Sequence, residues 1–332
     1  MKRGQSGIDV IGDIHGALPQ LIELLESLGY RESADFQHPE GRAVLFLGDL
    51  VDRGVDHLGV LRLVKRMVEA GSAIALMGNH EYNLVMWHFG LMGPKSSNGA
   101  TIDEIESDPG RWEWAFEFMM GMPLAYEGPG FRAIHAVWHQ RSIDDLKELG
   151  LTHGQTSFGG PASGLADHVV IGSPFIDDGL HPDLPTWRLE VTNERAHEVV
   201  MKGYEEPSEP FLDSKQCLRE AVRVTWWNRA NAPVPASGVT LFGHYWNLPP
   251  TESSTHTAPP HSSGTPALRA WLKEVVSGVT SRGKLDLLES DTAICVDFNG
   301  VNSISKRVGV GSYRWPEHQL VWICREQGIG DG

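Results

Sequence analysis

The chain has 332 residues, of which 41% are apolar and 21% are charged. This composition excludes disorder over most of the length and suffices for one large domain or two smaller ones. The formal net charge of −15 disfavours binding to long nucleic acids and to anionic membranes, because an acidic surface repels polyanions.

The cysteines and the N-terminus bear on the compartment. Cys217, Cys295 and Cys324 are far apart in the sequence, which argues against a disulfide framework or a thiolate zinc site and fits a reducing cytoplasm. The first apolar stretch is interrupted by Asp9 and Asp13, so no signal peptide is expected. No segment approaches the roughly 18 apolar residues of a membrane helix. We therefore expect a cytoplasmic protein with no membrane partner.

The first ninety residues predict a repeated alternation of strand and helix. Apolar residues recur at helical spacing after each short β-prone run, and Gly29 and Gly71 end the first two helices. This alternation predicts crossover connections and a sheet covered by helices. The expected strands are 8–11, 44–47 and 73–77, and the expected helices are 18–28, 58–68 and 82–89.

The rest of the chain is less regular. Further strands are expected at 131–137, 239–242, 292–298 and 319–324. With no internal repeat and no clear linker, we expect a single domain over residues 1–332, with insertions near 90–111, 167–185 and 251–290 that form loops or short helices. Within the last of these, 251–266 is rich in Pro, Ser and Thr and is expected to be a surface excursion.

Polar residues cluster where the predicted strands end. The first three strands run into GDIHG (12–16), GDLVDRG (48–54) and GNHE (78–81). Two later strands end at His135 and at the pair Gly243-His244. Because ligands gather at the carboxyl ends of strands in an open α/β sheet, these clusters should converge.

The convergent set contains two carboxylates, three imidazoles and one amide oxygen, and no cysteine. Such a mixed oxygen and nitrogen site suits divalent transition metals. The number of candidate ligands exceeds what one tetrahedral ion needs and suits two ions that share a bridging carboxylate. The candidate ligands are Asp13, His15, Asp49, Asn79, His135 and His244.

These motifs, in this order, resemble those of the calcineurin-like metallophosphoesterases. The DRG and GNHE forms are similar to the phosphoprotein-phosphatase branch, in its bacterial type. The three linked motifs cover 13–81, and the histidine matches extend the likeness to His244. The resemblance implies an αββα sandwich, in which mixed sheets are flanked by helices and two metals lie at the sheet edge.

The resemblance also implies how the metals are shared. Asp13 and His15 would bind the first metal, Asp49 would bridge, and Asn79, His135 and His244 would bind the second. The expected cofactors are two divalent metal ions per chain, with Mn²⁺ favoured and Fe or Zn as alternatives, since occupancy depends on availability.

The catalytic roles are a hypothesis built on the same motifs. His80 would protonate the leaving oxygen, and Asp52 would orient His80 and keep it protonated. Arg53 and Asn79 would contact the phosphate, Arg53 through its planar fork. A second phosphate-binding arginine has no clear motif match. Arg223 is a candidate by its position before His244, and Arg188 and Arg219 are rivals.

One departure from the family concerns the aromatic residues of the second half. Many family members have glycine after the residue that matches His135, whereas this chain has Ala136, with Trp138 close behind. We expect Trp138 to reshape substrate access. Trp138, Tyr245, Trp246 and the pair Trp226-Trp227 either line the approach to the site or belong to the core.

The expected function is a metal-dependent phosphatase, similar to protein serine/threonine phosphatases, in which a dimetal-bridging hydroxide attacks a phosphomonoester. The alternative with the same core is a hydrolase of dinucleoside polyphosphates, such as diadenosine tetraphosphate, or of nucleotide phosphodiesters. A catalytically dead binding scaffold would need a broken motif, and every motif position is filled. The expected partner is a phosphorylated substrate, either a phosphoprotein or a small phosphate ester.

Overall fold

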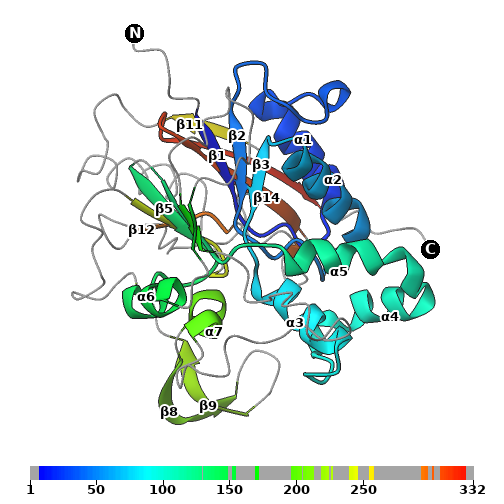
Figure 1. Cartoon of the computed structure of the whole chain (residues 1–332), viewed down its shortest axis with the longest axis vertical. Helices are drawn as coiled ribbons and strands as arrows, with labels where there is room; N and C mark the ends of the chain where they lie inside the picture. Colours follow the sequence, from blue (N-terminus) through cyan, green and yellow to red (C-terminus); the bar gives the residue numbers. More distant parts are fainter. Residues whose placement is uncertain are drawn as a thin grey trace.

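The computed structural model places two β-sheets face to face, with helices on their outer sides (Figure 1). Mixed sheets flanked by helices confirm the predicted fold class. The structure describes residues 7–128, 130–148, 152–154, 169–171, 196–203, 205–212, 218–223, 226, 239–245, 254–257, 293–297, 301–302 and 307–326.

The first sheet combines the N-terminal and C-terminal parts of the chain. Its parallel strands are β1 (Ile8–Ile11), β2 (Ala43–Phe46) and β3 (Ala73–Ala75). β14 (Arg307–Trp315) pairs antiparallel with β1, and β15 (Gln319–Glu326) pairs with β14. β11 (Ser254–Thr257) forms the edge beside β15, and β13 (Val301–Asn302) pairs with β14.

The second sheet has the order β12-β10-β5-β4-β7-β6. Its strands β5 (Phe131–Ile134), β10 (Val239–Phe242) and β12 (Ala293–Cys295) are parallel. The remaining strands, β4 (Ala125–Gly128), β6 (Thr152–Gly154) and β7 (Val169–Ile171), pair antiparallel. A separate two-stranded sheet, β8 (Glu205–Leu212) with β9 (Leu218–Arg223), lies beyond α7 (Figure 1).

Helices follow the first three strands, as the sequence predicts. α1 (Leu18–Leu28) ends at Gly29, which adopts a φ of 101°. α2 (His57–Glu69) begins after Asp56, whose carboxylate accepts the Gly59 N–H at 2.8 Å. α3 (Asn79–His88) begins three residues earlier than predicted. The other helices are α4 (Gly99–Ser107), α5 (Glu113–Met120), α6 (Gln140–Glu148) and α7 (Ala196–Lys202).

The alternation of side chains along the strands builds two cores. One set of strand residues packs between the sheets, and the next residue in each strand packs against the helices. Burial of each such side chain contributes about 1.5–3 kcal/mol. Val10, Leu45, Ala133 and Leu241 lie between the sheets, and Ile11, Phe46, Ile134 and Phe242 face the helices.

A buried charge cluster ties β1 to the strands on either side of it, β2 and β14. The Asp9 carboxylate is fully buried and accepts hydrogen bonds from Arg42 Nη2 at 2.8 Å, Arg314 Nε at 2.8 Å and Tyr30 Oη at 2.8 Å. Arg42 also donates to Glu317 at 2.7 Å. Because both carboxylate oxygens have donors, the buried charge is compensated, and the cluster joins β1 to the C-terminal hairpin.

The structure describes parts of all three expected insertions. Residues 90–111 contain α4 and two short 3₁₀ helices, Ser96–Asn98 and Pro109–Arg111, which agrees with short helices rather than loops. Within the expected excursion at 251–266, Ser254–Thr257 forms an edge strand that pairs with β15. Of 167–185, only β7 lies within the described residues, and the rest of 251–290 lies outside them. The single domain over 1–332 stays a prediction.

Among the described residues, none of the helices combines the length and the apolar character that a membrane crossing requires.

Candidate metal centre

Three loops meet at the carboxyl ends of β1, β2 and β3. The Asp49 carbonyl accepts the N–H groups of Ile14 at 3.0 Å and His15 at 2.9 Å, which joins the first loop to the second. The second and third loops touch through glycines. A Cβ on Gly48 would lie 2.4 Å from the Gly78 nitrogen, so a side chain here would push the two loops apart. The three sequence motifs therefore converge as predicted.

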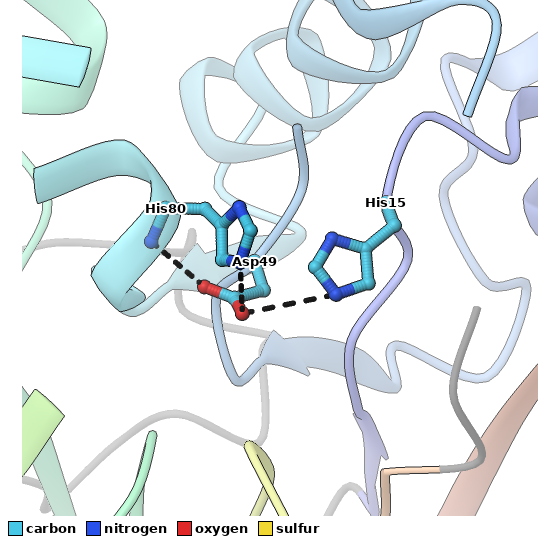
Figure 2. Close-up of side chains that lie close together, drawn as sticks. All are labelled: His15, Asp49 and His80. Carbon is cyan, nitrogen blue, oxygen red and sulfur yellow. Dashed lines mark hydrogen bonds and ion pairs between the residues drawn. The ribbon is translucent and has the colours of Figure 1, made fainter. Parts of the chain in front are cut away.

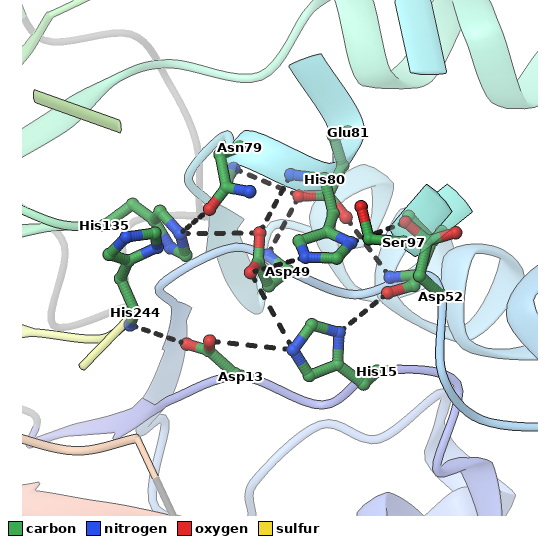
Figure 3. Close-up of polar contacts among 12 residues, drawn as sticks. Asp13, His15, Asp49, Asp52, Asn79, His80, Glu81, Ser97, His135 and His244 are labelled. Atoms are coloured by element: carbon green, nitrogen blue, oxygen red, sulfur yellow. Dashed lines mark hydrogen bonds and ion pairs between the residues drawn. The ribbon is translucent and has the colours of Figure 1, made fainter. Parts of the chain in front are cut away.

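Asp49 lies at the centre of the cluster, between two groups of imidazoles. Its Oδ2 is 3.8 Å from His15 Nε2 and 3.7 Å from His80 Nε2 (Figure 2). Its Oδ1 is 3.4 Å from His135 Nε2 (Figure 3). The candidate ligand atoms form two groups that share this carboxylate, one with His15 and His80 and the other with His135 and His244. A carboxylate in this place is suited to bridge two cations.

The orientations of the His15 and His135 rings show whether the cluster around Asp49 fits metal cations. His15 Nδ1 lies 2.9 Å from the Val51 carbonyl oxygen, and His135 Nδ1 lies 2.8 Å from the Leu47 carbonyl oxygen. A carbonyl only accepts, so each Nδ1 donates, and each neutral ring turns the lone pair of Nε2 toward the cluster. This backbone bond is typical of histidines that bind metals.

Electron pairs consequently face one another inside the cluster. His135 Nε2 lies 3.2 Å from Asn79 Oδ1, so two acceptors are opposed there. His15 Nε2 is buried, has no hydrogen-bond partner among the described residues, and lies 3.8 Å from an Asp13 carboxylate oxygen. A cation between such atoms would relieve both arrangements. The residues present therefore fit a pair of divalent metal ions.

His244 and Asp13 close the other side of the cluster. The Asp13 carboxylate accepts the His244 backbone N–H at 3.1 Å (Figure 3), and the Gly243 N–H donates to the His135 carbonyl at 2.8 Å. The His135 and His244 rings meet edge to face, with centroids 5.2 Å apart. The structure thus brings together all six predicted ligands, although they come from both halves of the chain.

Burial and charge set the protonation of these groups. Burial, with the charges of Asp297 and Asp49, raises the pKa of Asp13 well above its ordinary range. Burial also raises the pKa of Asp49, but the surrounding imidazoles outweigh it and lower that pKa. Burial and the Arg53 charge lower the pKa of His15. A neutral His15 beside crowded carboxylates is the protonation state that a cation requires.

His80 has a different environment from the other imidazoles. Its Nδ1 lies 2.5 Å from Asp52 Oδ2, a carboxylate and not a backbone carbonyl. Burial lowers the pKa of His80, but the charges of Asp49 and Asp52 outweigh burial and raise it. His80 therefore favours the protonated form, with Nε2 directed toward Asp49. This is the arrangement of a proton donor more than that of a metal ligand.

Several residues of the site adopt the left-handed backbone region that favours glycine. Among the described residues, eight non-glycine residues have a positive φ, and five of them belong to the site loops. Each such conformation costs on the order of 1–3 kcal/mol, so the surrounding hydrogen bonds must maintain it. These five residues are His15 (51°), Asp49 (52°), Asp52 (70°), Arg53 (61°) and His244 (65°).

Glu81 and Asp297 are components of the site that the sequence analysis assigned no role. Glu81 is fully buried and accepts N–H groups from Asp49 (2.8 Å), Leu50 (2.8 Å) and Gly78 (3.0 Å). Burial and the Asp49 charge raise the pKa of Glu81 to about 7. Its signal was a glutamate at the third helical position, which is typical of a capping box. Asp297 lies just after β12, outside the three motifs that follow β1, β2 and β3.

Of the arginines predicted to bind phosphate, the structure describes the side chain of Arg53 but not that of Arg223. Arg53 is exposed. Its positive charge acts to lower the pKa of Asp13, His15 and His80, although the net shift is downward for His15 alone among the three. Arg53 therefore lies at the surface, close enough for its charge to act on the cluster. Arg223 ends β9, with its backbone paired to Glu205 in the separate two-stranded sheet. Its side chain and Arg188 lie outside the described residues, so the second phosphate-binding arginine stays a prediction.

The aromatic residues near the cluster belong to the core. Trp138 is 1% exposed, with the Arg132 guanidinium 4.3 Å from its ring centroid, so the expectation that it shapes substrate access is wrong. Trp226 and Tyr245 are likewise buried. Their apolar rings gain more from packing between β10 and the helices than from contact with water. Trp227 and Trp246 lie outside the described residues.

Comparisons with known proteins agree with this geometry. The sequence model of the calcineurin-like phosphoesterases matches residues 7–165. The chain is 43% identical to the asymmetrical bis(5′-nucleosyl)-tetraphosphatase of Halalkalibacterium halodurans over 83 residues, 25% of this chain and 34% of the relative. It is 34% identical to the symmetrical bis(5′-nucleosyl)-tetraphosphatase of Ralstonia nicotianae over 140 residues, 42% of this chain and 45% of the relative. The chain thus spans less than half the length of these curated relatives.

The chain also matches a solved structure of a metallophosphoesterase from Sphaerobacter thermophilus. The match covers 96% of this chain and 88% of the other protein's chain, with 12% sequence identity and a TM-score of 0.38. Similarity at this level is too low to support an argument about the site.

Proposed function

The chain belongs to the calcineurin-like phosphoesterases, and we propose that it is a metal-dependent hydrolase of compact phosphate compounds, with dinucleoside polyphosphates as the favoured substrates. The observation that carries the proposal is the position of Asp49, whose carboxylate is shared by two groups of candidate metal ligands. A cationic pair at this place would supply the positive charge that an acidic chain needs in order to bind phosphate.

Asp13, His15 and Asp49 would hold one metal ion, and Asp49, Asn79, His135 and His244 would hold the other. When bound, two divalent ions activate water and stabilise the charge of a phosphoryl group in transfer. The side chains of this chain contribute by their orientation. The backbone bonds of His15 and His135 fix which ring nitrogen faces the cluster, so the ligands need little rearrangement on binding.

Two further residues would act on the substrate directly. Arg53 is exposed and its charge acts on the cluster, so its planar guanidinium would bind two phosphate oxygens there. His80 carries a proton that its contact with Asp52 stabilises. It would donate this proton from Nε2 to the leaving oxygen.

The names of the relatives favour dinucleoside polyphosphates over phosphoproteins. Both relatives described above are tetraphosphatases, and this supports the alternative of the sequence analysis better than the serine/threonine phosphatase. The net charge of −15 does not separate these two classes, but an acidic exterior around a cationic site disfavours long nucleic acids as substrates.

Phosphomonoesters are a second candidate class of substrate, and the proton on His80 supports it. The proton on His80 matters most when the leaving group is an alkoxide, as in phosphoserine or phosphothreonine. A departing phosphate, with a pKa of about 6, needs no proton at neutral pH. A buried acid such as His80 would thus be of greatest value to an enzyme that also cleaves monoesters.

A substrate panel tests the proposal. Mn²⁺-loaded protein is given diadenosine tetraphosphate, a phosphoserine peptide and a dinucleotide phosphodiester, and the products are separated by chromatography. We expect the highest kcat/KM with diadenosine tetraphosphate, and the nucleotide products show whether cleavage is symmetrical. A higher kcat/KM with the phosphopeptide would favour the second class. Activity that survives in Asp49→Asn would contradict the metal-dependent site itself.

A further inference from the structure

Both oxygens of the Asp52 carboxylate have hydrogen-bond partners, and two of these partners come from a segment that no motif includes. Oδ2 receives His80 Nδ1 at 2.5 Å (Figure 3) and the Asn98 side-chain amide. Oδ1 receives the hydroxyl of Thr101. Asp52 and Asn98 are each 1% exposed and Thr101 is fully buried, so the network is closed to solvent.

Asn98 and Thr101 reach Asp52 because of how residues 96–101 fold. Asn98 ends the 3₁₀ helix Ser96–Asn98, and Thr101 lies in the first turn of α4. Ile102 and Ile105 of α4 are 6% and 4% exposed and belong to the same core as α3. The segment is therefore anchored by apolar packing, and it presents two neutral donors to a carboxylate that is 46 and 49 residues away in the sequence.

The chemistry of these donors is specific. An amide and a hydroxyl fix the rotation of the carboxylate but bring no positive charge, so the full negative charge of Asp52 remains for His80. In a buried network each bond polarises the next, which strengthens the bond to His80. A lysine or arginine in their place would fix the carboxylate equally well but would compete with the proton on His80.

We propose that Asn98 and Thr101 are positioning residues, which hold Asp52 so that His80 keeps its ring orientation and presents Nε2 to the leaving oxygen. This inference rests on the proposed function of His80 as a proton donor. It assigns a role in the reaction to residues 96–101, which lie outside the three sequence motifs. It also predicts that disruption of the network lowers kcat more for substrates whose leaving group must be protonated.

The test compares Thr101→Val, which keeps the shape but removes the hydroxyl, with Thr101→Ser, which keeps the hydroxyl. Asn98→Ala is the second variant. Ser107→Ala is the matched control, because its hydroxyl bonds the Glu104 carbonyl within α4 and does not contact Asp52. Each Mn²⁺-loaded protein is assayed on glycerol 2-phosphate, which has an alkoxide leaving group, and on p-nitrophenyl phosphate, whose leaving group departs without a proton.

We expect Thr101→Val and Asn98→Ala to lower kcat on glycerol 2-phosphate about tenfold or more. This loss is a part of the 10²–10⁴-fold that a general acid contributes. On p-nitrophenyl phosphate the loss should stay below about threefold, and KM and metal content should not change. Thr101→Ser and Ser107→Ala should behave like the wild type. In a His80→Asn background, Asn98→Ala should cause no further loss, because both changes interrupt one network. Equal losses on both substrates, or full additivity with His80→Asn, would overturn the proposal.

A second measurement does not depend on turnover. In metal-free protein with ¹⁵N-labelled histidine, the Nδ1 proton of His80 should give a downfield signal that disappears in His80→Asn. We expect Thr101→Val and Asn98→Ala to shift or broaden this signal and Ser107→Ala to leave it unchanged. An unchanged signal in both network variants would refute the positioning role. If the wild type cleaves no phosphate ester, the proposed function fails. The spectrum would still show whether Asn98 and Thr101 hold Asp52 against His80.

Discussion

Glu81 supports the backbone of Asp49: its Oε2 accepts the Asp49 N–H at 2.8 Å, and its other oxygen accepts the N–H of Leu50 at 2.8 Å. A residue in the first turn of α3 therefore fixes the backbone of the second site loop, in which Asp49 has a φ of 52°. The left-handed conformation that directs the Asp49 carboxylate into the cluster is maintained by these bonds.

Replacement of Glu81 by Ala should destabilise the protein strongly. The change leaves buried N–H groups without acceptors, and each costs about 1–3 kcal/mol, so we expect a total loss above about 3 kcal/mol in the free energy of unfolding. Urea denaturation measures it. Glu106→Ala, at an exposed position of α4, is the control and should change stability by less than about 0.5 kcal/mol. A Glu81→Ala protein as stable as the control would show that water replaces the carboxylate.

Binding of metal should stabilise the native protein, because the ligands are assembled only in the folded state. Mn²⁺ at about 100 times its dissociation constant should add about 2.7 kcal/mol per site, seen as an increase in Tm that EDTA reverses. Asp49→Asn should abolish most of the increase, since Asp49 belongs to both groups of ligands. Asp103→Asn, on the exposed side of α4, should retain it. An undiminished increase in Asp49→Asn would place the metals elsewhere.

The raised pKa of His80 predicts how stability depends on pH in metal-free protein. A histidine whose folded pKa lies above its ordinary 6.5 stabilises the fold fully below pH 6.5, and loses that contribution as the pH rises through the folded pKa. His80→Asn should therefore destabilise more at pH 6 than at pH 9. His57 provides the contrast, because burial lowers its pKa.

A His57 that stays neutral in the fold destabilises at acid pH, so His57→Asn should lessen the loss of stability below pH 6.5. Thermal unfolding from pH 5 to pH 9 measures both variants. The same slope in His80→Asn and in the wild type would contradict the raised pKa.

Disruption of the Asp9 cluster should affect folding but not chemistry. Asp9→Ala removes the main partner of the buried Arg42 and of the partly buried Arg314, and we expect a cost of about 3–5 kcal/mol. Glu69→Ala removes the exposed pair with Lys65 and should cost at most about 0.5 kcal/mol. Below the unfolding temperature, kcat per folded molecule should equal that of the wild type. A selective loss of kcat in Asp9→Ala would connect the cluster to the site.

The sequence predicted the N-terminal half of the site well, for local reasons. β1, β2 and β3 are short apolar runs that end at glycines, so both the strands and the loops after them were visible. His135 and His244 were found because each directly follows an apolar strand. The six ligands could be identified before their distances were known, because parallel strands with crossover connections place their carboxyl ends at one edge.

Other features could not be predicted because their cause is tertiary. β14 contains Gly309 and Gly311, which are poor strand formers, and it is stabilised by pairing with β1 and β15. Asn98 and Thr101 carry no local sign that Asp52 is their partner. α3 was predicted to begin at Tyr82, because its first turn is polar, yet Asn79 and His80 begin the helix. Trp138 was misread because its position near His135 in the sequence says nothing about its side chain, which packs inward.

The position of β14 has a consequence for the order in which the chain acquires its fold. β1 (Ile8–Ile11) is synthesised long before its antiparallel neighbour, which spans Arg307–Trp315. During synthesis, one edge of β1 therefore stays open for nearly the whole length of the chain, and an open edge invites pairing with other chains. Asp9 on this strand also has no bond from Arg314 until residue 314 has been synthesised. Nascent chains halted before residue 307 should thus depend on chaperones, whereas chains halted after residue 326 should not.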